Sequence, residues 1–148
     1  MTTASTPTSS HKVGVGFSFS GPMGISLYSD VSDSNFIQGT VSIAPTNYLE
    51  ATGDYAFANN RFFGSIPTLT PFWGLGLLMV QGSSRYWLDS ETSLRTSQTH
   101  GGVRIPFGMN FVIPQTPVQL SAEIAPSIII APINYSYMQG GLNLRVLF

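Results

Sequence analysis

Apolar and polar residues alternate along most of this chain with a period of two. Between Val13 and Phe19 the odd-numbered positions are apolar, and glycine or serine stands at each position between them. An extended strand places successive side chains on opposite faces, whereas a helix repeats its apolar positions every three or four residues. The segment therefore predicts a β-strand with one apolar face.

The same alternation recurs between turn residues along the rest of the chain, although it blurs at Phe72 and Leu78. Prolines 67, 71, 106, 126 and 132 lie in or near these segments, and each removes a donor from the hydrogen-bond ladder, so we expect bulges or strand ends there. The predicted strands cover residues 13–20, 25–28, 37–43, 49–57, 66–80, 103–111, 118–124 and 142–148.

The number and length of these strands predict a closed barrel. About eight strands of about ten residues match the smallest membrane barrels, which must close because an open sheet edge cannot be satisfied in hydrocarbon. The predicted fold class is all-β, a closed eight-stranded antiparallel transmembrane β-barrel over residues 12–148, after a flexible tail at 1–11. Both termini would lie on the periplasmic side with the short turns at 31–35 and 114–117, and the long polar connection 81–99 would face the exterior.

Composition favours contact with lipid. Charged residues make up 9% of the chain and hydrophobic ones 43%, whereas a soluble domain carries about a quarter charged residues. Polar residues or glycine interrupt every apolar stretch, which argues against membrane helices, and the six Lys and Arg residues form no basic stripe for nucleic acid. A soluble lipocalin-like barrel is the alternative, but its apolar residues would face inward, where this chain places charges and glycines.

Five charged residues are predicted to point into the barrel: Glu50, Asp54, Arg104, Glu123 and Arg145. Charges inside a narrow barrel must pair, because a stranded one costs about 3–5 kcal/mol. We interpret them as a structural plug, since an eight-stranded interior is only wide enough for side chains to fill. A gate or ion path is the functional alternative.

The chain offers little for catalysis or for a cofactor. His11 and His100 could serve as a base or a metal ligand, but no Cys and no metal-binding spacing accompanies them, and we interpret both as exposed to solvent. The glycines match no phosphate-binding motif. We therefore expect no cofactor, no metal and no enzymatic activity, although a lipid-modifying enzyme stays an alternative.

Two sets of outward residues bear on the membrane. Small residues on the lipid face, which allow close approach between proteins in a membrane, suggest a homo-oligomer: Gly39, Ala51, Gly53 and Ala122. Aromatic residues near the predicted strand ends are typical of interfacial girdles: Tyr48, Tyr55, Phe57, Trp73, Trp87, Tyr135, Tyr137 and Phe148.

The chain also resembles a known family over residues 13–148. Its last segments, GVRIPFGMNFVIP, VQLSAEIAP and GGLNLRVLF, together with the opening VGVGFSFSGPMGISLY, are similar to small OmpA-like and OmpX-like outer-membrane barrels. The resemblance implies that the terminal strand, with Leu144, Val146 and Phe148, is the signal read by the outer-membrane assembly machinery. Residues 1–148 include no peptidoglycan-binding domain, so the resemblance gives no reason to expect cell-wall anchoring from them.

Together these observations predict a structural outer-membrane barrel with a plugged polar lumen, which could act as a homo-oligomer, in a Gram-negative-type bacterium. Its expected partners are membrane lipids, lipopolysaccharide and the assembly machinery. Residues 1–10 lack the apolar core of a secretory signal, so export would depend on a signal peptide absent from this chain. A narrow channel is the main alternative function.

Overall fold

The computed structural model describes residues 12–20, 23–44, 48–62, 66, 68–82, 99–131 and 135–148. The predicted tail 1–11, His11, Trp87, Pro67, Pro132 and nearly all of the long connection lie outside these ranges. The described residues contain no helix that is long and apolar enough to cross a membrane. They form the strands β1 (Val13–Phe19), β2 (Met23–Asp30), β3 (Asn35–Ala44), β4 (Tyr48–Ala58), β5 (Leu69–Gln81), β6 (Thr99–Arg104), β7 (Phe107–Val112), β8 (Val118–Ala131) and β9 (Tyr135–Leu147).

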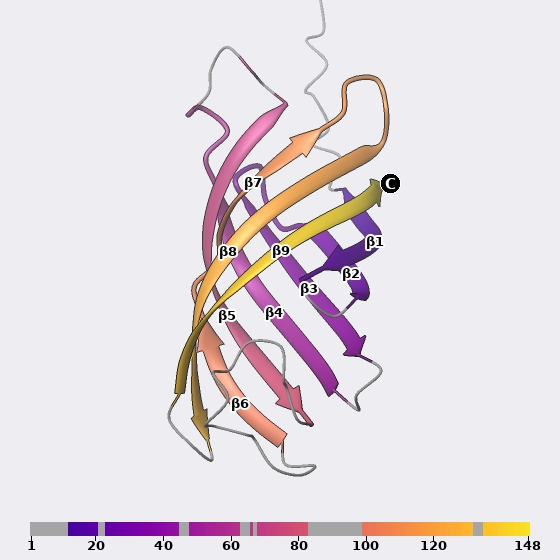
Figure 1. The fold of residues 1–148 in the computed structure, drawn as a ribbon. Helices are drawn as coiled ribbons and strands as arrows, with labels where there is room; N and C mark the ends of the chain where they lie inside the picture. The colour runs from indigo at the N-terminus through magenta and orange to yellow at the C-terminus, as the bar shows by residue number, and fades with distance from the viewer. Residues whose placement is uncertain are drawn as a thin grey trace, which may run out of the picture.

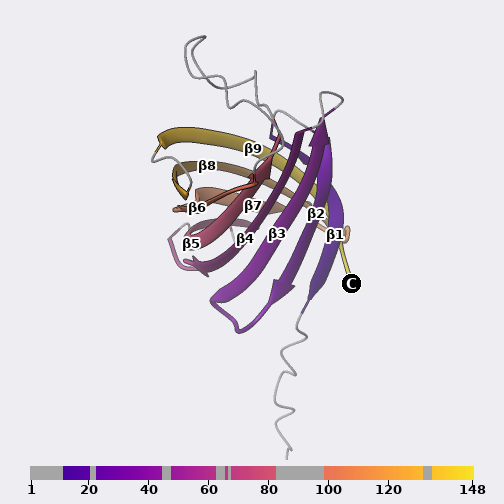
Figure 2. The same ribbon diagram turned by 90° about the horizontal axis from the view of Figure 1, so that it is seen from below.

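These strands form one antiparallel sheet that closes on itself. β1 pairs with both β2 and β9, and β4 pairs with both β3 and β5, so neither the first nor the last strand is an edge. β6 and β7 share one place in the ring, because both lie between β5 and β8. The ring therefore has eight strand positions, which confirms the predicted closed barrel. Figure 1 shows the tilted strands, and Figure 2 shows β2 to β4 on one wall and β8 and β9 on the other.

Residues Ile105 and Pro106 separate β6 from β7. The Ile105 amide donates to the Pro126 carbonyl at 3.0 Å, and the Gly74 amide donates to the Pro106 carbonyl at 2.8 Å, so both neighbouring strands stay connected across the interruption. The expected strand end at Pro106 is thus present. The bulge expected at Pro126 is not, since β8 keeps its register there, and the shift occurs at Gly101 and Gly102 instead. Pro126 has no N–H to donate. It is tolerated because it faces the Ile105–Pro106 interruption between β6 and β7, where the hydrogen-bond ladder is already broken.

The outer and inner faces of the barrel have opposite character. Most apolar residues of the predicted outward face are exposed. Leu77, for example, is 68% exposed and Leu142 is 59% exposed. Many inward positions of the strands carry serine, glutamine, asparagine or charged residues that are almost completely buried. This is the inverse of a soluble protein, in which the apolar face is buried.

Two apolar clusters interrupt the polar interior. Phe72 and Leu78, where the alternation blurred, both point into the lumen. The terminal cluster, named for its place near the chain ends, contains Tyr28, Phe36, Ala56, Phe72 and Leu147. The distal cluster, toward the other mouth, contains Ala44, Tyr48, Leu78, Val80 and Ile129. Tyr48 therefore lies inside the barrel and not in the predicted outer girdle.

Both ends of the described chain lie at one mouth of the barrel, which we call the terminal mouth. Val13 and Phe148 exchange backbone hydrogen bonds of 3.2 and 2.8 Å there. The same mouth carries the short turns 31–34 and 113–117, whereas the strand ends that residues 83–98 connect lie at the opposite mouth. In the second turn, Gln115 adopts a positive φ of 64° after Pro114, which is the geometry of a type II turn.

Candidate functional site

All five charged residues predicted for the lumen point into it. Glu50 and Asp54 come from β4, Arg104 from β6, Glu123 from β8 and Arg145 from β9. Arg145 is completely buried, and the other four side chains are buried or nearly so. Along β4, Glu50 and Asp54 lie between Tyr48 of the distal cluster and Ala56 of the terminal cluster. The charges thus form a central layer between two apolar ones.

Arg104 is the centre of a carboxylate–guanidinium–carboxylate triad. Its Nε lies 3.2 Å from Asp54 Oδ1, and its Nη2 donates to Glu123 Oε1. Its Nη1 donates to Gln139 Oε1 at 3.2 Å. Arg104 is thereby held by β4 on one side and by the adjacent strands β8 and β9 on the other, as expected for a guanidinium with a fixed fork of donors.

Arg145 is held by uncharged groups and not by the carboxylate partner that the charge pairing predicted. Its guanidinium donates to Ser26 Oγ at 2.7 Å, to Gln38 Oε1 at 2.9 Å and to Gln119 Oε1 at 3.2 Å. The guanidinium carbon also lies 5.5 Å from the centre of the Tyr28 ring, within cation–π range. Among the described residues no carboxylate lies within 4.0 Å of it. Neutral oxygens and an aromatic face therefore hold this cation.

Glu50 also lies outside the triad. It accepts a hydrogen bond from the Tyr48 hydroxyl and another, of 2.9 Å, from Gln139 Nε2. Gln139 thus connects Glu50 to Arg104, while Ser127 Oγ lies 3.1 Å from the same Gln139 oxygen. Each buried charge of the layer has at least one polar partner.

Sequence reasoning missed three glutamines of the layer: Gln38 and Gln139, which join charges, and Gln119, which binds Arg145. A glutamine amide supplies both a donor and an acceptor, so it can bridge a carboxylate and a guanidinium. Each stands at an inward position of the strand alternation, which was the available signal. Charged residues can be paired by sign from the sequence, whereas an uncharged glutamine offers no such pairing.

Two inward glycines make room for this layer. A Cβ added at Gly76 would stand 1.8 Å from Asp54 Oδ1, and one added at Gly108 would stand 2.6 Å from the Phe72 ring. Neither position can carry a side chain unless its neighbour moves. The glycines thus set how far the acidic and aromatic side chains extend into the lumen.

His100 differs from its prediction. It is 3% exposed and points inward from β6 instead of lying in solvent, and its Nδ1 has no hydrogen-bond partner among the described residues. No group of three or more His, Asp or Glu side chains that could hold a metal ion occurs in the described part of the chain.

The other predicted residues lie on the outside. Leu144 and Val146 face outward from β9, and Phe148 is exposed at the terminal mouth. Gly39, Ala51, Gly53 and Ala122 are also on the outer face, and a Cβ at Gly53 would meet no atom within 4 Å. Of the proposed girdle, Tyr55, Phe57 and Trp73 pack together outside, with ring centres 5.2 and 4.9 Å apart.

This inside-out arrangement recurs in solved structures. The N-terminal β-barrel domain of Pseudomonas aeruginosa OprF superposes with a TM-score of 0.64 at 12% identity, covering 93% of this chain and 96% of that one. The chain has the fold of a small outer-membrane β-barrel. The outer membrane protein Ail of Yersinia pestis matches this barrel as well, with a TM-score of 0.52 at 11% identity over 93% of this chain and 98% of Ail.

The barrel is similar to these proteins in fold alone, because only 12% and 11% of the aligned residues are identical. No protein-family model matches its sequence, and no curated protein does. The backbone tolerates this divergence because a barrel requires only alternation and closure, while its interior and loops vary freely.

Proposed function

We propose that this protein is a structural component of the bacterial outer membrane with a closed, non-conducting lumen. The observation that carries the proposal is a set of hydrogen bonds that cross the lumen between opposite walls. Gln38 of β3 donates to Glu123 of β8, and Gln139 of β9 donates to Glu50 of β4. Side chains that meet across the full diameter obstruct the axis of the barrel.

The energetics of the central layer oppose opening. A conducting state would have to separate Arg104 from Asp54 or Glu123, or withdraw Arg145 from its three oxygen partners. Breaking a buried charge pair costs about 3–5 kcal/mol unless water or a new partner replaces it. The aromatic side chains of the terminal cluster add a second obstruction, in which Phe36 is 1% exposed and its ring centre lies 5.2 Å from that of Phe72.

The outer surface supports the membrane location. Its apolar residues are suited to contact with lipid, and the Tyr55, Phe57 and Trp73 group is suited to the interfacial zone. With the terminal mouth in the periplasm, residues 83–98 would face the exterior, where lipopolysaccharide is the expected neighbour. The alternation of Leu144, Val146 and Phe148 in the last strand fits recognition by the assembly machinery.

The closed lumen is tested by recording currents from the refolded full chain in planar lipid bilayers. We expect no discrete conductance steps. A variant with Phe36, Gln38, Glu50, Glu123 and Gln139 all replaced by serine, shown by circular dichroism to be folded, should produce steps because both crossing hydrogen bonds and the Phe36 ring are gone. Steps of the same size from the unmodified protein would establish the channel alternative and refute the closed lumen.

The same preparation tests the enzymatic alternative. Incubation with lipid A in defined liposomes should leave its mass unchanged. A protein-dependent change in mass would contradict the structural role and assign a reaction to the barrel.

We further propose that the barrel associates with copies of itself through its outer face at Gly39 and Gly53. These two glycines pair across β3 and β4 and form the floor of an apolar groove of about 580 Å³ flanked by Leu27, Ile37 and Tyr55. The open space over Gly53 lets another surface approach the backbone closely, and such approach favours association in membranes.

Self-association is tested by the native mass of the protein in mild detergent. We expect a defined multimer that Gly53→Leu converts to a monomer by filling the groove. Gly101→Leu is the matched control, since Gly101 is also exposed with no atom near its Cβ position. A monomer mass for the unmodified protein would refute the homo-oligomer and leave the closed lumen unaffected.

A further inference from the structure

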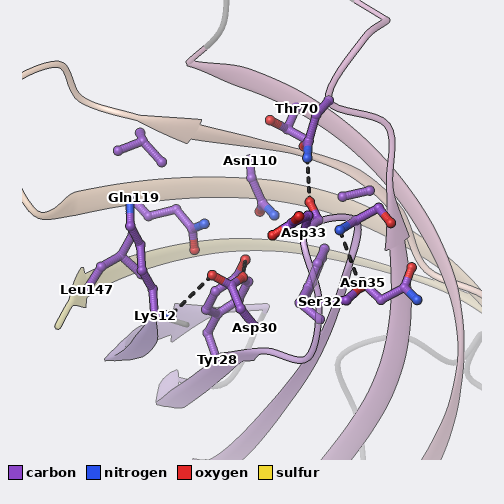
Figure 3. A pocket seen from close by; sticks show the side chains of 15 residues that line it. Lys12, Tyr28, Asp30, Ser32, Asp33, Asn35, Thr70, Asn110, Gln119 and Leu147 are labelled. Carbon is purple, nitrogen blue, oxygen red and sulfur yellow. Dashed lines mark hydrogen bonds between the residues drawn. The ribbon is translucent and has the colours of Figure 1, made fainter. Parts of the chain in front are cut away.

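A polar cavity opens at the terminal mouth, on the axis of the barrel. Its volume is about 400 Å³, and its lining comes from strands on all sides of the ring, from Tyr28 and Asp30 of β2 to Asn110 of β7 and Gln119 of β8. Figure 3 shows these side chains converging on one space. At about 30 Å³ per water, this space could hold a molecule the size of an amino acid or a short diamine.

The floor of the cavity is the terminal cluster. The rings of Tyr28 and Phe36, 4.9 Å apart, separate the cavity from the central charge layer. A ligand would therefore enter from the mouth and remain above the aromatic rings. Two lining residues also contact the charge layer, since Gln119 accepts from Arg145 and the Tyr28 ring faces its guanidinium.

The cavity carries more negative than positive charge. Asp30 and Asp33 are its acidic residues and Lys12 is its basic residue, among the described residues that line it. Asp30 is held in place, because its Oδ1 accepts from the Tyr28 hydroxyl at 2.5 Å and its Oδ2 accepts from the Lys12 backbone amide at 3.2 Å. Asp33 makes no ion pair with any other described residue. Its carboxylate is therefore available to a cation.

A second, independent observation points to a ligand with hydrogen-bond donors. Asn110 is 4% exposed, its side chain points into the cavity, and its Oδ1 has no hydrogen-bond partner among the described residues. Buried polar atoms in folded proteins are almost always paired, so an unpaired amide oxygen beside a cavity calls for a donor from outside the chain. The neighbouring Gln119, whose oxygen accepts from Arg145, makes no hydrogen bond to it.

We propose that this cavity binds a small molecule with a primary ammonium group and a polar body. An ammonium group carries three donors and no acceptor, which suits the carboxylates of Asp30 and Asp33, and a second donor on the ligand would reach Asn110 Oδ1. A free carboxylate ligand fits poorly, since two carboxylates face it against one lysine. The limited volume excludes a folded partner.

The test is calorimetric titration of the refolded full chain in detergent with 1,4-diaminobutane, with 1,4-butanediol as the uncharged control. We expect saturable one-to-one binding of the diamine and none of the diol. Asp33→Asn should weaken diamine binding at least fivefold, and Lys12→Gln should strengthen it. Equal binding of diamine and diol, or binding of magnesium chloride in place of the diamine, would overturn the proposal.

Asn110→Leu distinguishes a binding residue from a structural one. Because the amide oxygen has no partner, an apolar side chain of similar volume should leave the urea midpoint of the ligand-free protein unchanged or higher. The same variant should weaken diamine binding severalfold, although no charge has changed. A lowered midpoint with unchanged affinity would show that Asn110 serves the fold alone and would refute its place in the site.

Discussion

Gln38 and Glu123 join opposite walls of the barrel, with Gln38 Nε2 donating to Glu123 Oε2 at 2.7 Å. Three strands, β2, β1 and β9, lie between β3 and β8, so the two strands are four positions apart in a ring of eight. The same amide nitrogen lies 3.2 Å from Asp54 Oδ2, and the amide oxygen accepts from Arg145. The neutral side chain of Gln38 thus connects the triad around Arg104 to Arg145, which lies outside that triad.

Replacing Gln38 with leucine should destabilise the barrel substantially. The substitution removes hydrogen bonds to three charged groups, and bonds of this kind contribute about 1.5–3 kcal/mol each when a charged partner is left buried. We expect a loss of about 2–3 kcal/mol in the free energy of unfolding, measured by urea titration in detergent. This is less than the sum of three such bonds, because Asp54, Glu123 and Arg145 each keep another partner. Gln81→Leu, the same change at the exposed end of β5, is the matched control and should have little effect. Equal midpoints for the two variants would show that Gln38 does not organise the layer.

Removing Glu123 should leave Arg104 with one carboxylate partner, Asp54. Glu123→Ala is expected to lower the free energy of unfolding by about 3–5 kcal/mol, because a buried guanidinium loses one of its two carboxylates. Combining it with Arg104→Met should restore part of the stability, since both ends of the interaction are then absent. A double-mutant cycle by urea unfolding measures this coupling. Additive losses would mean that the two side chains do not interact in the folded barrel.

A charged substitution tests which side chains of β9 face the lipid. Leu144→Arg places a cation on the apolar outer face and should cost about 2–4 kcal/mol near the midplane of the bilayer. Gln115→Arg, at an exposed position of the turn at the terminal mouth, should be neutral. Folding into lipid vesicles, followed by tryptophan fluorescence, measures both. An arginine at 144 that folds as well as the unmodified protein would contradict the assigned lipid face.

Two glycines should respond oppositely to the same substitution. Gly76→Ala drives a methyl group into the Asp54 carboxylate and should destabilise by about 1–3 kcal/mol, the usual cost of overpacking. Gly53→Ala meets no atom within 4 Å and should stabilise a folded monomer by about 0.5–1 kcal/mol through the lower entropy of the unfolded chain. Urea midpoints compare the two in monomeric detergent preparations. Destabilisation of equal size would show that crowding at Gly76 is not the cause.

The sequence by itself determined the strands and the direction in which each face points. A two-residue period is a local property of extended backbone, so the outward positions of Val15, Leu77 and Leu144 could be predicted from their neighbours in the chain. Low charge content then decided between lipid and water for that face. The inward position of Glu50, Asp54, Arg104, Glu123 and Arg145 follows from the same period.

Tertiary structure alone decided which interior side chains meet. Contacts across a lumen depend on the tilt and stagger of strands distant in the chain, and no period within one strand encodes them. The triad therefore forms around Arg104, while Arg145 lies among glutamines and a tyrosine ring. Phe72 stands at an inward position of the strand period, and Gly108 on the neighbouring strand β7 leaves the space that its ring fills.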